Sequence, residues 1–562
     1  MKKNTVTKIP YLLPILFVFA QFTYAQKPGI ADAIDQLMVK NYPTDKPGAA
    51  VLVAQGDKII FKKGYGKASL ATGSDITPQS VFRIGSITKQ FTSTAILKLV
   101  NEGKISLQDK VVKYLPGYQP QGEFVTIENL LNHTSGIANY TGLLELRSAE
   151  NKAAAKSTEQ RFNDFNRVPL EYTPGERFSY TNSGFFILGM IIEKVSGITY
   201  GEYIEKNIFT PLKMKSSFYD GGNLRISKRT TGYIIDEKGF QEAPFVYHSN
   251  PFAAGALASS VEDLWKWNQS AVNFKIVPKT TMEKAWQPAK LNNGIKVNYG
   301  LGWSLTSIDE LKVIEHGGAI DGYLGYILYV PEEKVFVAIL TNSTNYACVN
   351  VSYDIARLIL NHPQKNPVIV SMNKQQLEEY TGNYKINETR FRTIATQGDR
   401  IFAIDGNSDP IEITSFKNDG FFVKDKPERF EFLRDQNNKI GALTFTRNGW
   451  ETEMGIRTNA TATTQKVAIS IEPTKFDEFV GVYEIAPGFN VKVWREGKIF
   501  LSEATGQGVY EIFPETETKF FVKDLNAGLE FLREDTAKVS AVIVTIGKNS
   551  NKGKKIFSSP KK

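Results

Sequence analysis

Apolar positions near the start of the chain recur first at helical spacing and then at strand spacing. In the segment 29–42, one helical face collects four apolar side chains: Ile30, Ile34, Leu37 and Met38. This spacing predicts an amphipathic helix. Residues 48–69 then show two strand-like runs on either side of a turn at Gln55–Asp57, which predicts a pair of strands. Mixed helical and strand patterns continue to about residue 362.

Beyond residue 362 the pattern changes to short alternating strands and turns. Pro363 and Pro367 interrupt any regular element there and predict a linker. Three strings then recur at a constant offset of 99 residues: EEYTGNY at 378–384 with DEFVGVY at 477–483, FFVKD at 421–425 and 520–524, and FEFLRD at 430–435 with LEFLRE at 529–534. An offset this long fits a duplicated small domain rather than a solenoid.

Each copy of the repeat is expected to be a small β-barrel. The strings RFEFLRD and NVKVWREGKIFL alternate at strand spacing, the second around a turn at Glu496–Gly497. Closing such strands into a barrel removes exposed strand edges. We therefore predict all-β domains at residues 373–458 and 472–562, joined by a linker at 459–465.

The N-terminus has the composition of an export signal. Three lysines within the first eight residues precede an apolar stretch, Ile9–Phe22, and small residues lie near Ala25. This order predicts a signal peptide at residues 1–25 and a periplasmic or secreted mature protein. A membrane anchor is the alternative, although the apolar run contains two prolines and is shorter than the roughly 20 residues of a spanning helix.

Composition indicates an ordinary globular protein of several domains. The 562 residues are 41% hydrophobic and 23% charged, which allows large cores. The net charge of +9 is modest, and no basic block stands out in the folded part, so a nucleic-acid partner is not indicated. The basic segment 551–562 is expected to be a short frayed tail. Cys348 is the only cysteine and excludes an intramolecular disulfide.

The first chemical motif is Ser86 with Lys89, at the start of a predicted helix. Residues three apart on a helix share one face, so the two side chains can touch. A buried, partly neutral lysine amine can accept the serine proton, and helix N-terminal N–H groups favour developing negative charge. The spacing recurs at Ser371/Lys374 and twice near the C-terminus, so it is not specific alone.

Two further motifs follow in order. Tyr180 and Asn182 lie two apart before an apolar helix, and His316-Gly317-Gly318 comes later. Tyr180 is placed to carry protons beside the lysine, and Asn182 to hydrogen-bond a substrate amide. A helix cap would explain Asn182 by itself but not the ordered set of three motifs.

With these motifs the chain resembles the serine β-lactamase and penicillin-binding-protein superfamily, on its class C side, over about residues 27–362. Four strings support the resemblance: LLNHTSGI (130–137), PGERFSYTNSGF (174–185), AAGALASSVEDL (253–264) and YGLGW (299–303). It implies an α+β fold, in which a β-lactamase/transpeptidase-like domain at 26–362 packs helices on an antiparallel sheet, followed by the two barrels. The site is expected between helices and sheet.

The resemblance also implies roles. Ser86 resembles the acylated nucleophile, and Lys89 with Tyr180 resembles the proton-transfer pair, whose shares stay open. Asn182 resembles the substrate-amide contact. The backbone N–H groups of Ser86 and Ala319 resemble an oxyanion hole. No metal or other cofactor is implied.

His316 departs from the commoner pattern of the superfamily. Most β-lactamases have Lys-Thr-Gly at the place of His316, Gly317 and Gly318, whereas the His-x-Gly variant with two C-terminal barrels resembles D-aminopeptidases. With an ordinary pKa of about 6.5, His316 is mostly neutral at pH 7 and regains charge toward pH 6. We expect it to hydrogen-bond Tyr180 or the substrate, and to hold a carboxylate poorly. No ligand spacing suggests a metal, and His133 is expected to be a structural loop residue.

The sequence thus predicts an exported serine hydrolase that cleaves amide, peptide or ester bonds through an acyl-enzyme on Ser86. Small peptides containing D-residues, such as cell-wall fragments, are the first candidate substrates. A β-lactamase or carboxylesterase remains the alternative within the enzyme class. A non-hydrolytic cell-wall-binding or sensor protein is the alternative outside it. The oligomeric state and the role of the barrels stay open.

Overall fold

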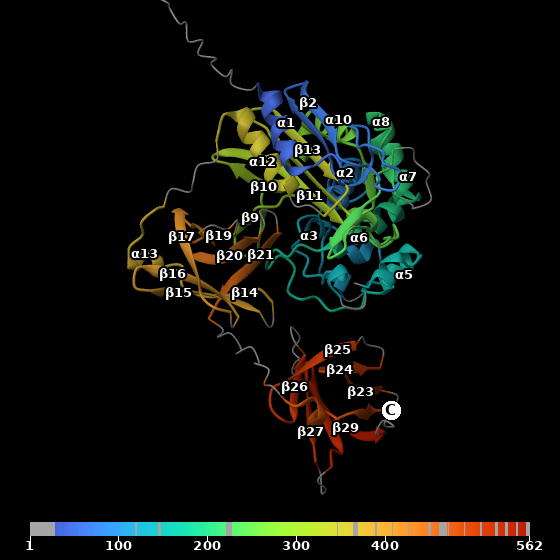
Figure 1. Ribbon diagram of the computed structural model, residues 1–562, viewed down its shortest axis with the longest axis vertical. Coiled ribbons are helices and arrows are strands. Elements are labelled where there is room, and N and C mark those ends of the chain that lie inside the picture. Colours follow the sequence, from blue (N-terminus) through green and yellow to red (C-terminus); the bar gives the residue numbers. More distant parts are fainter. Residues whose placement is uncertain are drawn as a thin grey trace, which may run out of the picture.

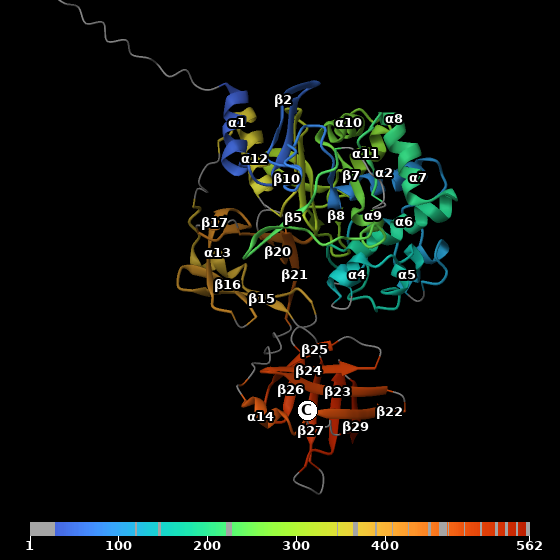
Figure 2. The same ribbon diagram turned by 45° about the vertical axis from the view of Figure 1, so that its right-hand side comes forward.

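Figures 1 and 2 show the computed structural model of the protein. The predicted signal peptide lies outside the described residues, as does all but the first residue of the predicted linker 459–465. The structure describes residues 29–557 with the following gaps: 119–120, 144–145, 147, 221–227, 345–346, 364–368, 388–389, 407, 425, 427, 448–450, 460–468, 470, 488, 506–508, 523–526, 534–537 and 547–548.

An antiparallel sheet of six strands forms the centre of the N-terminal domain, residues 30–360. Neighbouring strands pair in the order β10 (Ser304–Ile308), β11 (Leu311–Ile320), β12 (Tyr323–Val330), β13 (Val335–Thr341), β1 (Ala49–Gln55) and β2 (Lys58–Tyr65). The predicted strand pair and its turn at Gln55–Asp57 are confirmed by β1 and β2.

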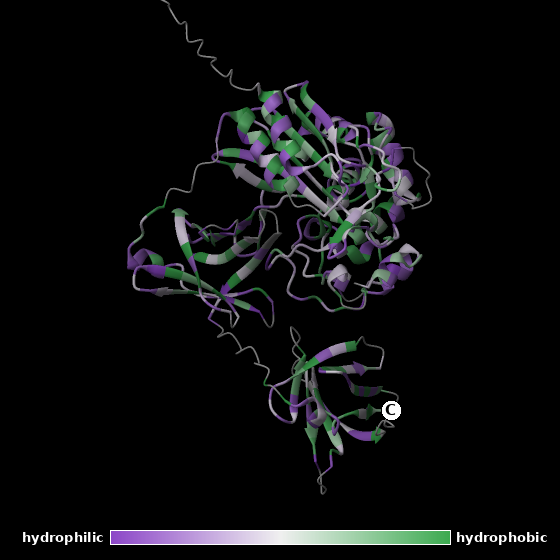
Figure 3. Ribbon diagram, viewed as in Figure 1, coloured by the Kyte–Doolittle hydropathy of each residue, from purple (hydrophilic) through white to green (hydrophobic). Residues whose placement is uncertain are grey.

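Strand β1 shows why the middle of this sheet is buried on both faces. Side chains alternate along a strand, so Ala50, Leu52 and Ala54 face one hydrophobic cluster, while the residues between them face the other. The helices α1 (Ile30–Asn41) and α12 (Ala347–Leu360) cover one face, and α10 (Val261–Val272) covers the other. The helices α1 and α12 show hydrophobic and hydrophilic residues in alternating bands (Figure 3).

A helical region lies beside the sheet and completes the domain. Its elements include α2 (Thr88–Asn101), α3 (Ile127–Leu131), α4 (Ala149–Ala153), α5 (Thr158–Asn163), α6 (Asn182–Ser196), α7 (Tyr200–Ile204), α8 (Thr210–Leu212), α9 (Phe252–Gly255) and α11 (Lys279–Ala285). Short strands join these helices: β3 (Phe82–Arg83), β4 (Phe218–Tyr219), β5 (Tyr233–Asp236), β6 (Gly239–Glu242), β7 (Leu257–Ser259), β8 (Ala289–Lys290) and β9 (Lys296–Val297). Helices α2, α6 and α9 pack on one another, and they carry Lys89, Asn182 and Ala254 of the site described below.

Two closed eight-stranded β-barrels follow, so the expected α+β architecture is confirmed. The first, after α13 (Lys374–Glu378), contains β14 (Gly382–Lys385), β15 (Phe391–Gln397), β16 (Arg400–Asp405), β17 (Ile411–Lys417), β18 (Gly420–Phe422), β19 (Arg429–Arg434), β20 (Ile440–Arg447) and β21 (Glu451–Thr458). The second, after α14 (Pro473–Phe476), contains β22 (Gly481–Ala486), β23 (Phe489–Glu496), β24 (Ile499–Ala504), β25 (Val509–Pro514), β26 (Lys519–Val522), β27 (Ala527–Leu532), β28 (Ala541–Ile546) and β29 (Asn549–Phe557).

The expectation of a frayed C-terminal tail is wrong for its first residues. Strand β29 pairs with both β28 and β22 and closes the second barrel. Its apolar side chains are sparse, so the sequence pattern did not reveal the strand. Backbone pairing with a neighbouring strand on each side holds this strand in place.

Equivalent contacts in the two barrels show that the repeat is a structural duplication. The Tyr384 hydroxyl donates to the Tyr380 carbonyl at 2.7 Å, and Tyr483 donates to Phe479 at the same distance. The ion pair between Arg434 and Glu379 likewise has a counterpart between residues 533 and 478. Each pair in the second barrel lies at the 99-residue offset of the sequence repeat.

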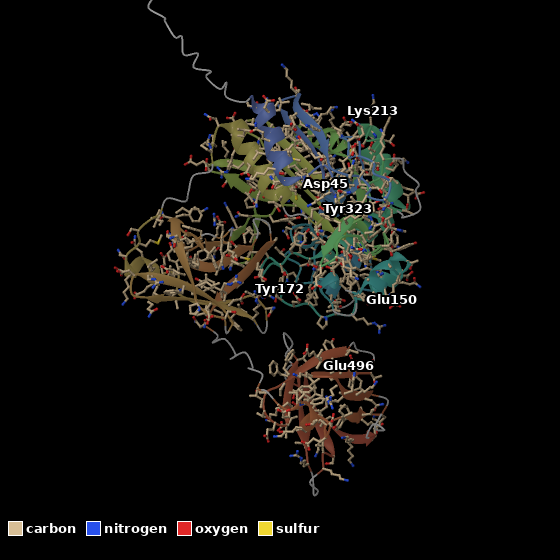
Figure 4. The ribbon with its side chains drawn as sticks, viewed as in Figure 1. Asp45, Glu150, Tyr172, Lys213, Tyr323 and Glu496 are labelled. Atoms are coloured by element: carbon tan, nitrogen blue, oxygen red, sulfur yellow. The ribbon has the colours of Figure 1, made fainter. Side chains whose placement is uncertain are left out.

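The first barrel shares a hydrophobic cluster with the N-terminal domain. Ala442 and Met454 of the barrel are buried against Ile295 and Tyr299 of that domain, with Tyr180 packed on the edge of the same cluster. At a second contact, Arg177 donates to the Ile386 carbonyl at 2.7 Å. Tyr172, whose ring lies under that guanidinium, is on a loop that faces the first barrel (Figure 4). The second barrel has a core cluster made of its own residues.

Among the helices of the described residues, none has both the length and the apolar composition of a membrane span. The segments Asn182–Ser196 and Tyr200–Leu212 pass such a test only together, across a bend of 77°.

Candidate active site

The structure brings the three sequence motifs together between the helical region and strand β11. Ser86 lies in a single 3-10 turn, Gly85–Ile87, that leads directly into α2. It is the only residue from Val81 to Gln90 that is not fully buried. Ser86 is therefore partly accessible to solvent, while the residues on both sides of it are held in the core.

Two glycines let β11 approach the serine turn backbone to backbone. Gly85 has a positive φ of 49°, and a Cβ built on it would lie 2.6 Å from the Ala319 nitrogen. A Cβ on Gly318 would lie 2.0 Å from the Ile84 carbonyl oxygen. Any side chain at these positions would push the strand away. Gly318 thus acts through close packing, and it sets the exposed Ala319 beside the serine turn, as an oxyanion hole requires.

Lys89 is fully buried and directed at the serine. Its Nζ lies 2.9 Å from Ser86 Oγ, 2.8 Å from Asn182 Oδ1 and 2.9 Å from the carbonyl oxygen of Ala254. The rings of Tyr180 and Phe185 lie within 5.5 Å of the same nitrogen. Burial lowers the pKa of Lys89 well below its ordinary value.

The partners of Lys89 suit a neutral amine. Asn182 Oδ1 and the Ala254 carbonyl can only accept, so they take both N–H groups of a neutral amine. The remaining lone pair faces Ser86, whose hydroxyl can then donate to it. This is the arrangement in which a lysine removes a serine proton. The Ala254 carbonyl belongs to the AAGALASS string, whose part in the site the sequence reasoning missed.

Tyr180 packs beside Lys89, whose Nζ lies 4.8 Å from the centre of the Tyr180 ring. Burial raises the pKa of the Tyr180 phenol above its ordinary value, and the nearby Ser86 hydroxyl offsets part of that rise. At neutral pH the phenol is therefore protonated and suited to pass a proton rather than to remove one. The geometry favours Lys89 as the initial base and Tyr180 as the group that returns a proton to the leaving atom.

Asn182 is held from both ends at the start of α6. Its backbone N–H donates to Asn139 Oδ1 at 3.1 Å, and its Nδ2 donates to Thr141 Oγ1 at 3.0 Å. With Oδ1 on Lys89, the side chain has one amide hydrogen and one lone pair left for a substrate. Asn139 and Thr141 were not found from the sequence, because nothing in a loop pattern marks them as neighbours of a distant helix.

His316 hydrogen-bonds Tyr299 rather than Tyr180. Its Nδ1 lies 2.6 Å from the Gly317 carbonyl, which can only accept, so Nδ1 carries the hydrogen. Its Nε2 then accepts from the Tyr299 hydroxyl at 2.9 Å. The Tyr180 and His316 ring centres are 6.3 Å apart. Both ring nitrogens thus have protein partners, and a direct contact of His316 with substrate stays a prediction.

The expectation that His316 gains charge near pH 6 is wrong. Burial, and the neighbouring Lys89 when charged, lower the pKa of His316 to about 3. The imidazole therefore stays neutral throughout the range in which the protein is handled. The ordinary pKa of about 6.5 applies to a solvated imidazole, whereas His316 is only 3% exposed.

The ratio of kcat/KM for a carboxylate substrate to that for its amide-capped counterpart is consequently expected to stay constant between pH 7.5 and 6, within about twofold. A change in the charge of His316 would be needed to raise it, and that change occurs near pH 3. The measurement uses one matched substrate pair across the range. A rise of the ratio toward pH 6 that disappears in His316→Gln would contradict this account.

The ring of His133 packs against that of Tyr180. Its ring centre is 4.2 Å from that of Tyr180 and 4.7 Å from that of Tyr299, and it is fully buried. Its Nδ1 accepts the Thr181 N–H at 3.2 Å. The predicted structural role fits these contacts, since the histidine fixes both the backbone before Asn182 and the plane on which Tyr180 rests.

Glu315 precedes His316 on β11 and faces the opposite side of the sheet. The Tyr353 hydroxyl donates to it at 2.7 Å and the Thr306 hydroxyl at 3.0 Å. Burial raises the pKa of this carboxyl from 4.5 to about 7. A titrating group thus lies on the strand that carries the candidate oxyanion residue.

Glu315 is expected to make stability fall as pH rises. Its contribution is fully present below pH 4.5, where folded and unfolded chains both hold the proton, and it is lost as pH rises to about 7. The shift corresponds to a loss on the order of 3 kcal/mol. Unfolding free energies of wild type, Glu315→Gln and the exposed control Glu333→Gln should be measured from pH 5 to 8. The unfolding free energy of Glu315→Gln should rise relative to that of wild type as pH increases across this range. Equal slopes of unfolding free energy against pH in the two proteins would contradict the assignment.

The described residues contain no group of three His, Cys, Asp or Glu side chains placed to hold a metal ion. The chemistry that the site offers is that of a serine, an amine, a phenol and backbone N–H groups.

Comparison with known proteins agrees with this geometry. The sequence profile of the Beta-lactamase family matches residues 31–360, which contain every site residue named above. The chain is 26% identical over 403 residues to Penicillin-binding protein 4* of Bacillus subtilis (strain 168), covering 68% of this chain and 89% of that protein.

Two solved structures show the same fold. One is the octameric penicillin-binding protein homologue from Pyrococcus abyssi, with 28% identity and a TM-score of 0.53, covering 76% of this chain and 99% of that one. The other is a D-stereospecific amidohydrolase from Streptomyces sp., with 25% identity and a TM-score of 0.50, covering 58% of this chain and 98% of that one.

Proposed function

Because the chain belongs to the beta-lactamase family of serine hydrolases, we propose that it hydrolyses amide or peptide bonds of D-amino-acid-containing substrates through an acyl-enzyme on Ser86. The observation that carries the proposal is the buried Lys89 amine, 2.9 Å from the Ser86 oxygen, with its other two partners both obligate acceptors. A protein that only binds ligands has no need of such a base.

The proposed reaction follows from the contacts. Lys89 removes the Ser86 proton as the oxygen attacks the substrate carbonyl, and the backbone N–H groups of Ser86 and Ala319 stabilise the oxyanion. Tyr180 passes a proton to the leaving nitrogen as the carbon–nitrogen bond breaks. Water then attacks the ester with the same groups acting in reverse, and Ser86 is restored.

The proposed substrate preference has two grounds, the similarity to a D-stereospecific amidohydrolase and the lack of charge on His316. A D-stereospecific amidohydrolase shares 25% identity and the fold with this chain. The neutral His316 offers no fixed positive charge to a substrate carboxylate. This favours amides and aminoacyl peptides over β-lactams and C-terminal carboxylates. We propose in addition that the protein is exported, with cell-wall fragments as its peptide source.

A covalent probe combined with a substrate panel tests the proposal. A serine-directed fluorophosphonate should label Ser86, located by peptide mass spectrometry. A D-aminoacyl p-nitroanilide should be hydrolysed faster than D-Ala-D-Ala, an ester or a chromogenic cephalosporin. Labelling without turnover of any substrate would favour the sensor alternative. Efficient cephalosporin hydrolysis at pH 7.5 would favour a β-lactamase, and an adduct on another serine would end the assignment of Ser86.

A further inference from the structure

An ion pair joins the helical region to the sheet at one end of the site. Lys152 Nζ, on α4, lies 2.9 and 3.2 Å from the two carboxylate oxygens of Asp321. Asp321 is in the turn between β11 and β12, two residues beyond Ala319. Figure 4 labels Glu150 and Tyr323, which flank the two partners in sequence on α4 and β12.

The order of residues along β11 indicates which end of the site holds each part of the substrate. His316 lies at the end near Tyr180 and Tyr299, Ala319 follows at the serine turn, and Asp321 comes last. With the substrate carbonyl oxygen at the N–H groups of Ser86 and Ala319, the leaving nitrogen must face Tyr180, the proton donor. The acyl part then extends toward Asp321, which lies in the turn after β11, two residues or about 7 Å of extended chain beyond Ala319.

We propose that Asp321 binds an ammonium group on the acyl part of the substrate, which replaces Lys152 as its partner. The ligand class is therefore an aminoacyl compound with a free amine close to the scissile carbonyl. This inference rests on the proposed hydrolase function and adds the residue that selects the acyl group.

Asp321 is the fixed member of the pair and Lys152 the movable one. The next residue, Gly322, has a φ of 83°, and a Cβ built on it would lie 2.5 Å from the Ala243 Cβ and 2.8 Å from Gly232, so the turn is pinned by close packing. Lys152 is a long side chain on a five-residue helix. Both side chains are 31% exposed, and a partly exposed pair contributes little stability, so exchange is easy.

Exchange of one ammonium for another leaves the local charge unchanged. A substrate carboxylate would instead have to displace Asp321 from Lys152 and would leave two carboxylates close together. The pair therefore selects for an amine and against an acid on the acyl side. An N-acylated substrate keeps an amide N–H but has no positive charge to replace that of Lys152.

The test compares a D-alanyl p-nitroanilide with its N-acetyl form in full-length wild type, Asp321→Asn, Lys152→Met and the exposed control Asp75→Asn. Asp321→Asn should lower kcat/KM for the free amine at least tenfold and leave the N-acetyl substrate within about threefold. Lys152→Met should raise kcat/KM for the free amine, because the competing ammonium is gone. The control should match wild type on both.

Equal losses on both substrates in Asp321→Asn, or an unchanged ratio in both variants, would overturn the inference while leaving the hydrolase intact. The Lys152→Met arm keeps the test decisive if Asp321→Asn folds poorly. If wild type hydrolyses neither substrate and the fluorophosphonate does not label Ser86, the proposed function itself fails and this inference fails with it.

Discussion

Replacing Lys89 with methionine is expected to lower kcat by roughly 10⁴- to 10⁶-fold, about as much as Ser86→Ala does. Methionine has nearly the same length but no basic nitrogen to accept the serine proton, and the buried Lys89 amine, 2.9 Å from Ser86 Oγ, is the base of the proposed reaction. The double variant Ser86→Ala/Lys89→Met should be no slower than either single variant, because the two side chains act as one unit.

The measurement is kcat and KM on the free-amine p-nitroanilide for the two single variants and the double variant. Lys98→Met is the matched control, since Lys98 lies on the same helix but pairs with Glu102 at the surface. It should retain wild-type kcat. Methionine also leaves the Ala254 carbonyl and Asn182 Oδ1 without a donor, so melting temperatures must be recorded. Additive losses in the double variant would show that Lys89 does not act through the serine.

Tyr180→Phe is less severe in this scheme. The phenol of Tyr180 is protonated at neutral pH, and it acts on the leaving atom rather than on the serine proton. Water that reaches the partly exposed Ser86 can replace part of that function, whereas nothing replaces the buried amine. The sequence treated Lys89 and Tyr180 as an undivided pair. Burial, which no local pattern records, is what separates their roles.

Local patterns predicted the elements better than their contacts. The alternation at residues 48–69 gave the strand pair β1–β2, and the 99-residue repeat gave two barrels. Both signals come from residues close in sequence or from copies of one sequence. The partners of His316 could not be predicted in this way. Tyr299 lies 17 residues away in the YGLGW string, which was seen only as a mark of resemblance.

Charge states were the weakest part of the sequence reasoning. A reference pKa assumes a solvated side chain, but His316 and Glu315 are both buried in the strand that borders the site. Burial lowers the pKa of His316 to about 3 and raises the pKa of Glu315 to about 7. Both shifts disfavour the charged form of the side chain. Whether a residue in a strand is buried depends on what packs on each face, and here α12 and the helical region decide it.

The contact between the first barrel and the N-terminal domain also had no sequence signal. The repeat suggests two independent β units, and a chain ending near residue 365 would then keep its catalytic part intact. In the structure Ile295 and Tyr299 are buried against Ala442 and Met454 of the first barrel. The apolar side chains on β20 and β21 alternate as in any barrel, and nothing in that pattern distinguishes those that meet another domain.

Removing both barrels is therefore expected to lower kcat/KM by about 10²-fold, whereas removing the second barrel alone leaves it within about threefold. Without the first barrel, the hydrophobic cluster that supports Tyr180 and Tyr299 opens to water. A displacement of about 1 Å in a catalytic group has an effect of this size. The second barrel has a core of its own residues, so its loss leaves that cluster closed.

The experiment compares chains ending at residues 365 and 471 with the full chain, using kcat/KM on the free-amine substrate and fluorophosphonate labelling of Ser86. The shorter chain should still be labelled, but slowly, because Ser86 and Lys89 are held by the 3-10 turn Gly85–Ile87 and by α2 rather than by the barrel. Ile295→Ala in the full chain should reproduce part of the loss without any truncation. Full activity of the chain ending at 365 would show that the cluster does not position Tyr180. Equal losses in both truncated chains would instead assign the effect to the second barrel.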